Sequence, residues 1–343
     1  MSCTCFIIPK DVLEKLSEDS ELSEELRQAS GDTARVSTEL RNLRAQAGFL
    51  TNAMSTLGAI QEHLAPFPAV KVYDCKKHQT LPGTAVRHRN SSPDLSASRT
   101  FKETTAVANF YKQVFGRNSI DGAGMTMMSS IHFGDNYNNA MWNGTQMIYG
   151  DGDRQIFIDF TVANDIIAHE LTHGVTQYTL QLAYSDEAGG LNESISDCFG
   201  TMFRQWQANQ DVNQADWLIG HDILGPVARA KGYTCLRNMA NPADPHCLAP
   251  QPVNYSTITP DMDPHYSSGP PNRAFYLACK SAGGKSWEKV GQIWYRAMTG
   301  FGPSPDMTMK EFADRARQLA GEMYDTVPSV AVAVDKAWKE IGL

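Results

Sequence analysis

The spacing of apolar residues predicts helices over most of the second half of this chain. From Val162 onward, apolar positions recur every three or four residues, which places them on one face of a helix. Helices are expected over Val162–Leu182, Gly190–Gln207, Asn272–Ala282, Trp287–Met298, Met309–Met323 and Val327–Ile341. Residues 209–270 are rich in Pro, Asp and Asn and predict a long irregular region, a kind of segment that usually serves a function.

A different pattern precedes this helical half. Residues 78–100 are polar, with Gly, Ser, Asn and Pro, and predict a loop. Phe101–Phe115 again has helical spacing. Short apolar runs such as Met125–Ile131 and Gln146–Tyr149 then alternate with Gly, Asn and Asp, which is typical of strands joined by turns.

The first 65 residues predict a helical unit ahead of a linker. Short amphipathic helices are expected around Leu13 and Leu26, and a longer one from Thr38 to His63, before Pro66 and Pro68 end the pattern. The N-terminal apolar run, residues 6–8, is shorter than the roughly 7–15 residues of a secretory signal. We therefore expect no signal peptide, and either a cytoplasmic protein or one exported by a leaderless route.

Composition excludes several classes of protein. A chain of 343 residues predicts roughly two domains, at about 150 residues each. The formal net charge of −8 argues against non-specific binding to nucleic acid. No stretch approaches the roughly 18 apolar residues of a membrane span, and 7 cysteines are too few and too scattered for a disulfide scaffold. A monomer without nucleic-acid or membrane partners is expected.

Metal chemistry is indicated by the string Ala168-His169-Glu170-Leu171-Thr172-His173. Two histidines four residues apart lie on one face of a helix, so both imidazoles can reach one ion. Glu170 lies beside them and is a candidate base for a metal-bound water.

The next predicted helix carries Gly189-Gly190-Leu191-Asn192-Glu193-Ser194-Ile195-Ser196-Asp197. Glu193 is a candidate third ligand, which completes the two-histidine, one-glutamate set of a catalytic zinc. Asp197 lies one turn further on and is a candidate acceptor for the free N–H of a ligand imidazole. Since much of this helix is apolar, a buried pair of acids there would need a cation.

With these two motifs, the chain resembles the thermolysin-like neutral metallopeptidases, and more closely their protealysin-like branch with a short propeptide. The resemblance covers nearly all of residues 70–343. It also rests on Asn138-Asn139-Ala140-Met141-Trp142-Asn143-Gly144, Tyr149-Gly150-Asp151-Gly152-Asp153 and Asn272-Arg273-Ala274-Phe275-Tyr276. It implies an α+β, two-domain metalloprotease with a β-rich lobe at residues 66–161, an α-helical lobe at residues 162–343 and the zinc helix between them.

The resemblance also implies roles for single residues. His169, His173 and Glu193 match the zinc ligands, and Glu170 matches the general base. Tyr184 and His265 match the two donors that stabilise the oxyanion. Asp261 is expected to orient His265, although this loop is one residue shorter than usual and leaves Asp263 open as the alternative.

Substrate binding is implied at three further positions. Arg237 matches the arginine that holds substrate carbonyl groups, and Asn139 and Ala140 match the edge strand that pairs with the substrate backbone. An apolar pocket near Ile166, Ile219 and Leu236 would favour a hydrophobic residue just after the scissile bond.

One departure from the family concerns calcium. Secreted members hold a double calcium site, and Arg204, Leu218 and His221 stand here where its acidic ligands are expected, while Asp165 and Asp216 persist. Because calcium requires six to eight oxygen ligands, we predict that this site is lost and that Arg204 pairs with Asp165 in its place. Calcium elsewhere stays open.

The start of the chain resembles a protealysin-like propeptide, so residues 1–65 are expected to inhibit the enzyme intramolecularly. Cys5, or less favourably Cys3, is a candidate to bind the zinc as a thiolate. The alternative is that Phe6 and Ile7 block the cleft without a thiol.

The other cysteines carry weaker predictions. Cys235 and Cys247 flank Arg237 and are candidates for a disulfide around a short loop. Cys198 and Cys279 are expected in the core, and Cys75 in the linker.

The resulting prediction is a zinc-dependent neutral endopeptidase in its precursor form, acting on peptides and proteins. One alternative is a catalytically idle homologue that binds peptides. Another is a peptidase whose main substrate is a partner protein inside the producing cell.

Overall fold

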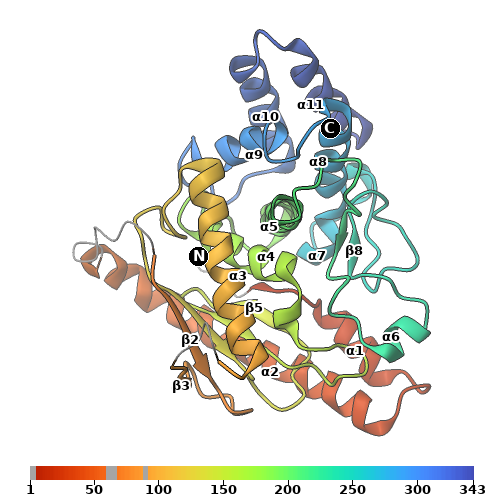
Figure 1. The fold of residues 1–343 in the computed structure, drawn as a ribbon. Coiled ribbons are helices and arrows are strands. Elements are labelled where there is room, and N and C mark those ends of the chain that lie inside the picture. The colour runs from red at the N-terminus through yellow and green to blue at the C-terminus, as the bar shows by residue number, and fades with distance from the viewer. Residues whose placement is uncertain (1–4, 59–67, 88–91) are drawn as a thin grey trace. The chain divides into compact units, whose positions relative to one another are not determined.

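The computed structural model describes residues 5–58, 68–87 and 92–343, which form two compact units (Figure 1). The first comprises Met1–Val175 and Gly220–Thr234, and the second comprises Thr176–Ile219 and Cys235–Leu343. Across the described segments, no helix combines the length and the apolar character needed to cross a membrane.

The first unit begins with two helices, α1 (Lys10–Glu18) and α2 (Glu24–Gly58). On α1, Val12, Leu13 and Leu16 are buried together, as the amphipathic pattern predicts. The separate helix expected from Thr38 is instead continuous with the preceding one, because no proline interrupts the chain between residues 24 and 58. The last predicted positions of that helix, residues 59–63, lie outside the described residues.

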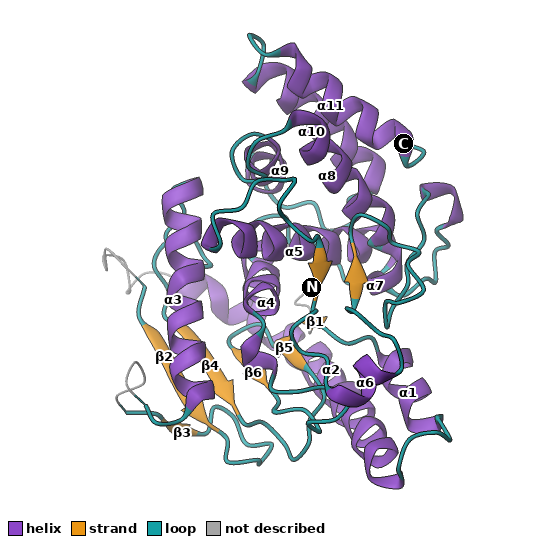
Figure 2. Cartoon of the chain, turned by 45° about the vertical axis from the view of Figure 1, so that its right-hand side comes forward, coloured by secondary structure: helices purple, strands orange, loops and turns teal. Residues whose placement is uncertain are grey.

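A six-stranded sheet lies beside these helices, with the strand order β1-β5-β6-β4-β2-β3 (Figure 2). Its strands are β1 (Cys5–Phe6), β2 (Val70–Asp74), β3 (Thr84–Ala85), β4 (Met127–Ile131), β5 (Ala140–Trp142) and β6 (Met147–Tyr149). The strands β2, β4 and β6 run parallel, whereas β5 runs antiparallel to β6. The N-terminal β1 pairs antiparallel with β5. The start of the chain therefore becomes one edge of the sheet.

Helix α3 (Leu95–Phe115) packs against β2 and β4. It begins earlier than the predicted Phe101, because the Asp94 carboxylate accepts the backbone N–H groups of Ser96 and Ala97 and so caps the helix. The loop predicted for residues 78–100 is therefore wrong in part, since this segment also contains β3 and the first turns of α3.

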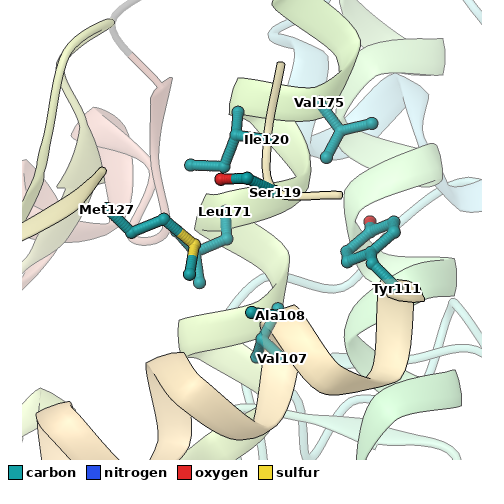
Figure 3. A pocket seen from close by; sticks show the side chains of 8 residues that line it. All are labelled: Val107, Ala108, Tyr111, Ser119, Ile120, Met127, Leu171 and Val175. Atoms are coloured by element: carbon teal, nitrogen blue, oxygen red, sulfur yellow. The ribbon is translucent and has the colours of Figure 1, made fainter. Parts of the chain in front are cut away.

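Helix α4 (Asn164–Gln177) runs close to α3, and a small apolar cavity lies between them (Figure 3). Figure 3 shows Val107 and Tyr111 of α3 and Leu171 and Val175 of α4 around this cavity. The Tyr111 hydroxyl is hydrogen-bonded at 2.7 Å to the hydroxyl of Thr172 on α4. This bond and the apolar packing fix the position of the helix that carries the histidine motif.

An apolar cluster joins the N-terminal segment to the sheet. Phe6 is buried among Phe133, Tyr137 and side chains of β5 and β6, and Val36 of α2 covers it. The full cluster is Phe6, Val36, Cys75, Phe133, Tyr137, Met141 and Ile148. Cys75 is thus a core residue and not the linker thiol that was predicted, because it follows directly after β2.

The second unit is mainly helical, as the apolar spacing predicts. Its helices are α5 (Asp186–Gln207), α7 (Pro264–Ser267), α8 (Gly269–Ala282), α9 (Val290–Thr299), α10 (Met309–Met323) and α11 (Pro328–Glu340). Trp294 of α9 stacks on Trp338 of α11, with ring centroids 5.7 Å apart, and Phe312 of α10 contacts both. These aromatic rings form the centre of the helical packing.

The long region expected to be irregular, residues 209–270, contains only short elements. Strands β7 (Leu218–Ile219) and β8 (Arg237–Asn238) pair antiparallel in the second unit. Helix α6 (Pro226–Ala230) belongs to the first unit. Most of the region is loop, which agrees with its composition.

A partly exposed charge bridge joins three segments of the first unit. The His132 ring lies between two carboxylates, with Nδ1 2.6 Å from Asp151 Oδ1 and Nε2 2.8 Å from Asp94 Oδ2. Hydrogen bonds to Asp151 and Asp94 raise the pKa of His132 to about 9, although burial opposes this. A protonated His132 therefore joins the start of α3 to the turn after β6.

Replacing His132 with Gln should remove a pH-dependent part of the stability. A histidine with a pKa raised from 6.5 to about 9 stabilises the fold fully below pH 6.5, and this contribution disappears as the pH rises through 9. We expect the native chain to lose about 2 kcal/mol of unfolding free energy over that interval, and the variant to lose much less. Urea unfolding at a series of pH values measures the difference. The exposed His246, changed to Gln, is the matched control, and parallel pH profiles for native chain and His132 variant would contradict the bridge.

Candidate metal centre and catalytic residues

Helix α4 places the two histidines of the motif side by side. His169 and His173 are both buried, and their Nε2 atoms are 3.0 Å apart. Two nitrogens bound tetrahedrally to one zinc ion at about 2.0–2.1 Å would lie about 3.3 Å apart. The two Nε2 atoms are therefore already about as far apart as two ligands of one zinc ion would be.

Close packing sets the distance between α4 and β5. Gly174 of α4 faces the Trp142 ring, and a Cβ atom at this position would lie 2.7 Å from Ile120 Cγ2 and 3.2 Å from the ring. No larger residue fits there without displacing its neighbours. The glycine in the sequence after His173 thus allows the metal helix to approach the edge of the sheet.

Glu170 is oriented by the backbone of this strand. Its Oε2 atom accepts the Trp142 N–H at 2.8 Å, and its side chain is fully buried. Burial raises the pKa of Tyr149, and the Glu170 charge raises it further. The carboxylate is therefore fixed in poorly solvated surroundings. Sequence reasoning missed the Trp142 N–H, because a backbone donor leaves no residue-type signal.

The second unit brings three further predicted residues together. The Tyr184 hydroxyl donates to Glu193 Oε1 at 2.5 Å and lies 3.3 Å from His265 Nε2. His265 Nε2 is 3.7 Å from Glu193 Oε1. Glu193 on α5, Tyr184 before it and His265 on α7 thus form one polar cluster in which a carboxylate meets two hydrogen-bonding groups.

The prediction that Asp261 orients His265 is wrong. The carboxylate on His265 Nδ1 is that of Asp263, at 2.6 Å, and the same oxygen accepts the His265 backbone N–H at 2.9 Å. Asp263 caps α7, two residues before His265, whereas Asp261 is exposed. The His265 charge outweighs burial and lowers the pKa of Asp263. The shortened loop shifts the role to the alternative that the sequence left open.

A fully buried ion pair lies behind this cluster. Arg237 of β8 donates to Asp197 of α5 through Nε and Nη2, both at 2.8 Å. Asn272 Nδ2 donates to the same carboxylate at 2.9 Å. This bidentate ion pair, with a further hydrogen bond from the amide, compensates two buried charges that would each be costly without a partner. The role of Asp197 in orienting a ligand imidazole stays a prediction, and the role of Asn272 was not foreseen.

The residues present fit zinc. His169 and His173 are buried on α4 of the first unit, and Glu193 is buried on α5 of the second unit. Two imidazoles and one carboxylate match the donor set of a catalytic zinc site, whereas calcium and magnesium prefer oxygen ligands alone.

The edge strand β5 is covered by the N-terminal segment. The Ile7 N–H donates to the Ala140 carbonyl at 3.1 Å. The Asn139 side chain accepts the Ile8 N–H at 3.0 Å and donates to the Ile8 carbonyl at 3.2 Å. Asn139 and Ala140, the two predicted backbone-binding positions, thus already bind a peptide strand of the same chain.

Cys5 does not have the state that a zinc-blocking thiolate requires. It pairs with Trp142 in the sheet and is disulfide-bonded. A sulfur atom in a disulfide cannot ionise to the thiolate that binds zinc. With Cys5 oxidised, β1 still covers β5 by backbone pairing. The alternative candidate, Cys3, lies outside the described residues.

Comparison with known proteins places these features in a family. Residues 53–177 match the family described as Thermolysin metallopeptidase, catalytic domain. Residues 180–343 match Thermolysin metallopeptidase, alpha-helical domain.

Individual relatives agree with this match. The "Extracellular metalloprotease" of Pectobacterium carotovorum subsp. carotovorum is 38% identical over 283 residues, which cover 79% of this chain and 80% of the relative. "Protease PrtS" of Photorhabdus sp. is 36% identical over 79% of this chain and 76% of its own.

A solved structure covers nearly the whole chain. The precursor of protealysin, a metalloproteinase from Serratia proteamaculans, superposes with a TM-score of 0.82 at 32% identity, over 98% of this chain and 99% of that one. The motif of two histidines and a glutamate, with Glu193 after it, fits the zinc peptidases of this group. The chain therefore belongs to the thermolysin family of metallopeptidases and is a zinc-dependent neutral endopeptidase of the protealysin type.

Proposed function

We propose that His169, His173 and Glu193 hold the zinc ion, that Glu170 is the general base, and that the N-terminal segment keeps this precursor inactive. The proposal rests mainly on the orientation of Glu170. It follows His169 directly on α4, and the Trp142 N–H holds its carboxylate at the edge strand. A base in this position projects from the metal helix α4 toward β5, the strand that would hold the substrate.

Each side chain then has a defined task in peptide hydrolysis. Zinc, when bound, supplies a Lewis acid that makes water more acidic and polarises the substrate carbonyl. Glu170 accepts the proton from the attacking water and delivers it to the leaving nitrogen. Tyr184 and His265 donate hydrogen bonds to the oxygen on which negative charge develops. Asp263 accepts from His265 Nδ1, so that Nε2 faces the reaction.

Substrate binding is proposed to use main-chain contacts and one apolar pocket. Asn139 and Ala140 would bind an extended peptide as they bind Ile7 and Ile8 here, which is independent of side-chain type. Arg237 is proposed to hold a substrate carbonyl. Apolar residues at Ile166, Ile219 and Leu236, all buried, support a preference for a hydrophobic residue after the scissile bond.

Residues 1–65 are proposed to be an inhibitory propeptide. Strand β1 pairs with β5, and α2 adds two polar contacts nearby. The Thr33 hydroxyl accepts the Asn138 N–H at 3.0 Å, and the Ser37 hydroxyl is 2.8 Å from that of Tyr137. At the far end, Lys231 pairs with Asp19 and Glu21 in the turn between α1 and α2. The propeptide thus pairs with β5, the strand with which a substrate would pair.

The proposal extends to the lobes, the oligomeric state and the partners of the enzyme. The lobes are residues 66–161 and 162–343, and the mature enzyme acts as a monomer on peptides and proteins, without nucleic-acid or membrane partners. One relative is named an extracellular metalloprotease, which supports export of this chain by a leaderless route over a cytoplasmic location. The idle-homologue alternative is not favoured, since Glu170, Tyr184 and His265 are all present and placed in polar contacts.

The double calcium site of secreted relatives is proposed to be absent. Arg204 forms an ion pair with Asp216 at 3.5 Å, which puts a positive side chain beside an acid that persists. Leu218 has no oxygen in its side chain, and His221 Nδ1 bonds to the Thr234 carbonyl at 2.8 Å. Asp165 Oδ2 accepts the Gly220 N–H at 2.8 Å. The pairing of Arg204 with Asp165 itself stays a prediction.

Changing Glu170 to Gln should abolish turnover without loss of metal. The amide keeps the size of the side chain but cannot accept the proton, so we expect kcat to fall by about 10²–10⁴-fold or more. Activity is measured on a peptide with a hydrophobic residue after the scissile bond, after propeptide removal, and zinc content by elemental mass spectrometry. The exposed Glu322, changed to Gln, is the control. A Glu170 variant with near-native kcat would contradict the assigned base.

Changing Thr33 to Val should loosen the propeptide. The variant keeps the shape of the side chain but leaves the buried Asn138 N–H without its acceptor, which costs about 1–3 kcal/mol. We expect activity to appear about 5- to 100-fold faster from the purified precursor. Thr33 Oγ1 also donates to the Ala29 carbonyl of its own helix at 2.8 Å, and Thr38 Oγ1 makes the equivalent bond to the Ala34 carbonyl at 2.8 Å. Thr38→Val is therefore the matched control, and equal maturation rates for both variants would argue against the contact.

Calcium should not bind beside Asp165 and Asp216 in the zinc-loaded chain. Because Arg204 supplies a fixed positive charge where the ion would bind, a crystal of the Glu170→Gln chain grown with calcium and zinc should hold no calcium ion at this place. Arg204→Glu should introduce one. A calcium ion found there in the chain with native Arg204 would overturn the proposal.

A further inference from the structure

Two buried thiols outside the catalytic cluster lie close together in the second unit. The sulfur atoms of Cys235 and Cys247 are 3.3 Å apart, and both residues are almost completely buried. They are 12 positions apart in the sequence. No disulfide joins them in the structure. Other buried cysteines have different neighbours, since Cys75 Sγ lies near the Pro82 carbonyl and Cys198 Sγ near the Ser194 hydroxyl.

The backbone already holds the pair side by side. Cys235 and Cys247 are opposite each other in a parallel β-bridge. The Leu248 N–H donates to the Cys235 carbonyl and the Ala249 N–H to the Leu236 carbonyl, both at 3.0 Å. A disulfide needs its sulfurs about 2.05 Å apart. A small rotation of the side chains is therefore enough, and the backbone need not move far.

The segment between the two cysteines carries Arg237. This residue starts β8 and forms the buried pair with Asp197. The loop also has internal bonds, such as Asn238 Nδ2 to Asp244 Oδ2 at 3.0 Å. The Cys235–Cys247 bridge closes this loop at its base. A covalent bond there would limit how far the strand holding Arg237 can move.

We propose that Cys235 and Cys247 are oxidised to a disulfide that closes the Arg237 loop and holds Arg237 in its substrate-binding position. The reaction is thiol–disulfide exchange with a small disulfide such as oxidised glutathione. One cysteine first forms a mixed disulfide and releases one glutathione thiol. The second cysteine then displaces the other glutathione thiol. Overall, one S–S bond forms in the protein, two S–H bonds are lost, and the two electrons and two protons appear in two glutathione molecules.

Burial determines when this oxidation takes place. The neighbouring Cys235 and burial both raise the pKa of the Cys247 thiol, so the reactive thiolate is scarce in the folded chain. The bond should therefore form while the chain folds in an oxidising environment, and resist reduction afterwards. A chain that folds under reducing conditions would keep the dithiol seen here.

The first experiment determines whether the bond forms. The full Glu170→Gln chain, which cannot digest itself, is refolded from denaturant with oxidised and reduced glutathione or with reduced glutathione alone. Peptide mapping by mass spectrometry should find the Cys235 and Cys247 peptides joined, 2 Da lighter than the two thiol peptides together, only in the oxidised sample. Cys247→Ala should lose this linkage and Cys75→Ser should keep it. Reduced or differently linked cysteines in the oxidised sample would overturn the proposal.

The second experiment tests the effect on Arg237 and rests on its proposed role in substrate binding. Matured native enzyme is prepared in both redox forms and assayed on the same peptide. We expect KM to be about 3- to 10-fold lower in the disulfide form with kcat nearly unchanged, and Cys247→Ala to keep the high KM in both buffers. A disulfide without any change in KM would overturn the restraint on Arg237. The assignment of Glu170 is tested separately, by kcat and zinc content, and would stand.

Discussion

The hydrogen bond between the Trp142 N–H and Glu170 joins the two elements that the proposed peptide hydrolysis would use. Trp142 belongs to β5, the strand that offers its backbone to an extended peptide, and Glu170 belongs to α4, the helix of the two histidines. Gly174 allows these elements to pack closely enough for the bond to form. A buried carboxylate held by a backbone donor keeps one orientation, and general base catalysis depends on such an orientation.

The same strand explains how a precursor can be stable and inactive. An exposed edge strand has unpaired backbone groups that will bind any extended segment. In this chain the Ile7 N–H donates to the Ala140 carbonyl, and the Ile8 backbone bonds to the side-chain amide of Asn139. Phe6 is buried in an apolar cluster of the same unit. With substrate binding at β5 as proposed, inhibition and substrate binding would use the same physical interaction, and removal of the propeptide would leave the edge open for substrate.

The buried pair of Arg237 and Asp197 has a comparable role in the second unit. A charged guanidinium without exposure to solvent is tolerable because the Asp197 carboxylate pairs with it, and Asn272 donates a further hydrogen bond to that carboxylate. This arrangement fixes β8, and the neighbouring cysteines lie where a covalent bond would reinforce it. Charge pairing and loop closure therefore act on the same short strand.

The sequence by itself determined the helices of the second unit, the two histidines on one helical face, and the acidic motif of α5, because these depend on local spacing along the chain. It also pointed to Asn139 and Ala140 through the family motif. Only the tertiary structure decided that Asp263 rather than Asp261 orients His265, that Cys75 lies in the core, and that Cys5 lies in a sheet as part of a disulfide. Backbone donors such as the Trp142 N–H and packing across distant segments have no residue-type signature, so they appear only when the folded chain brings them together.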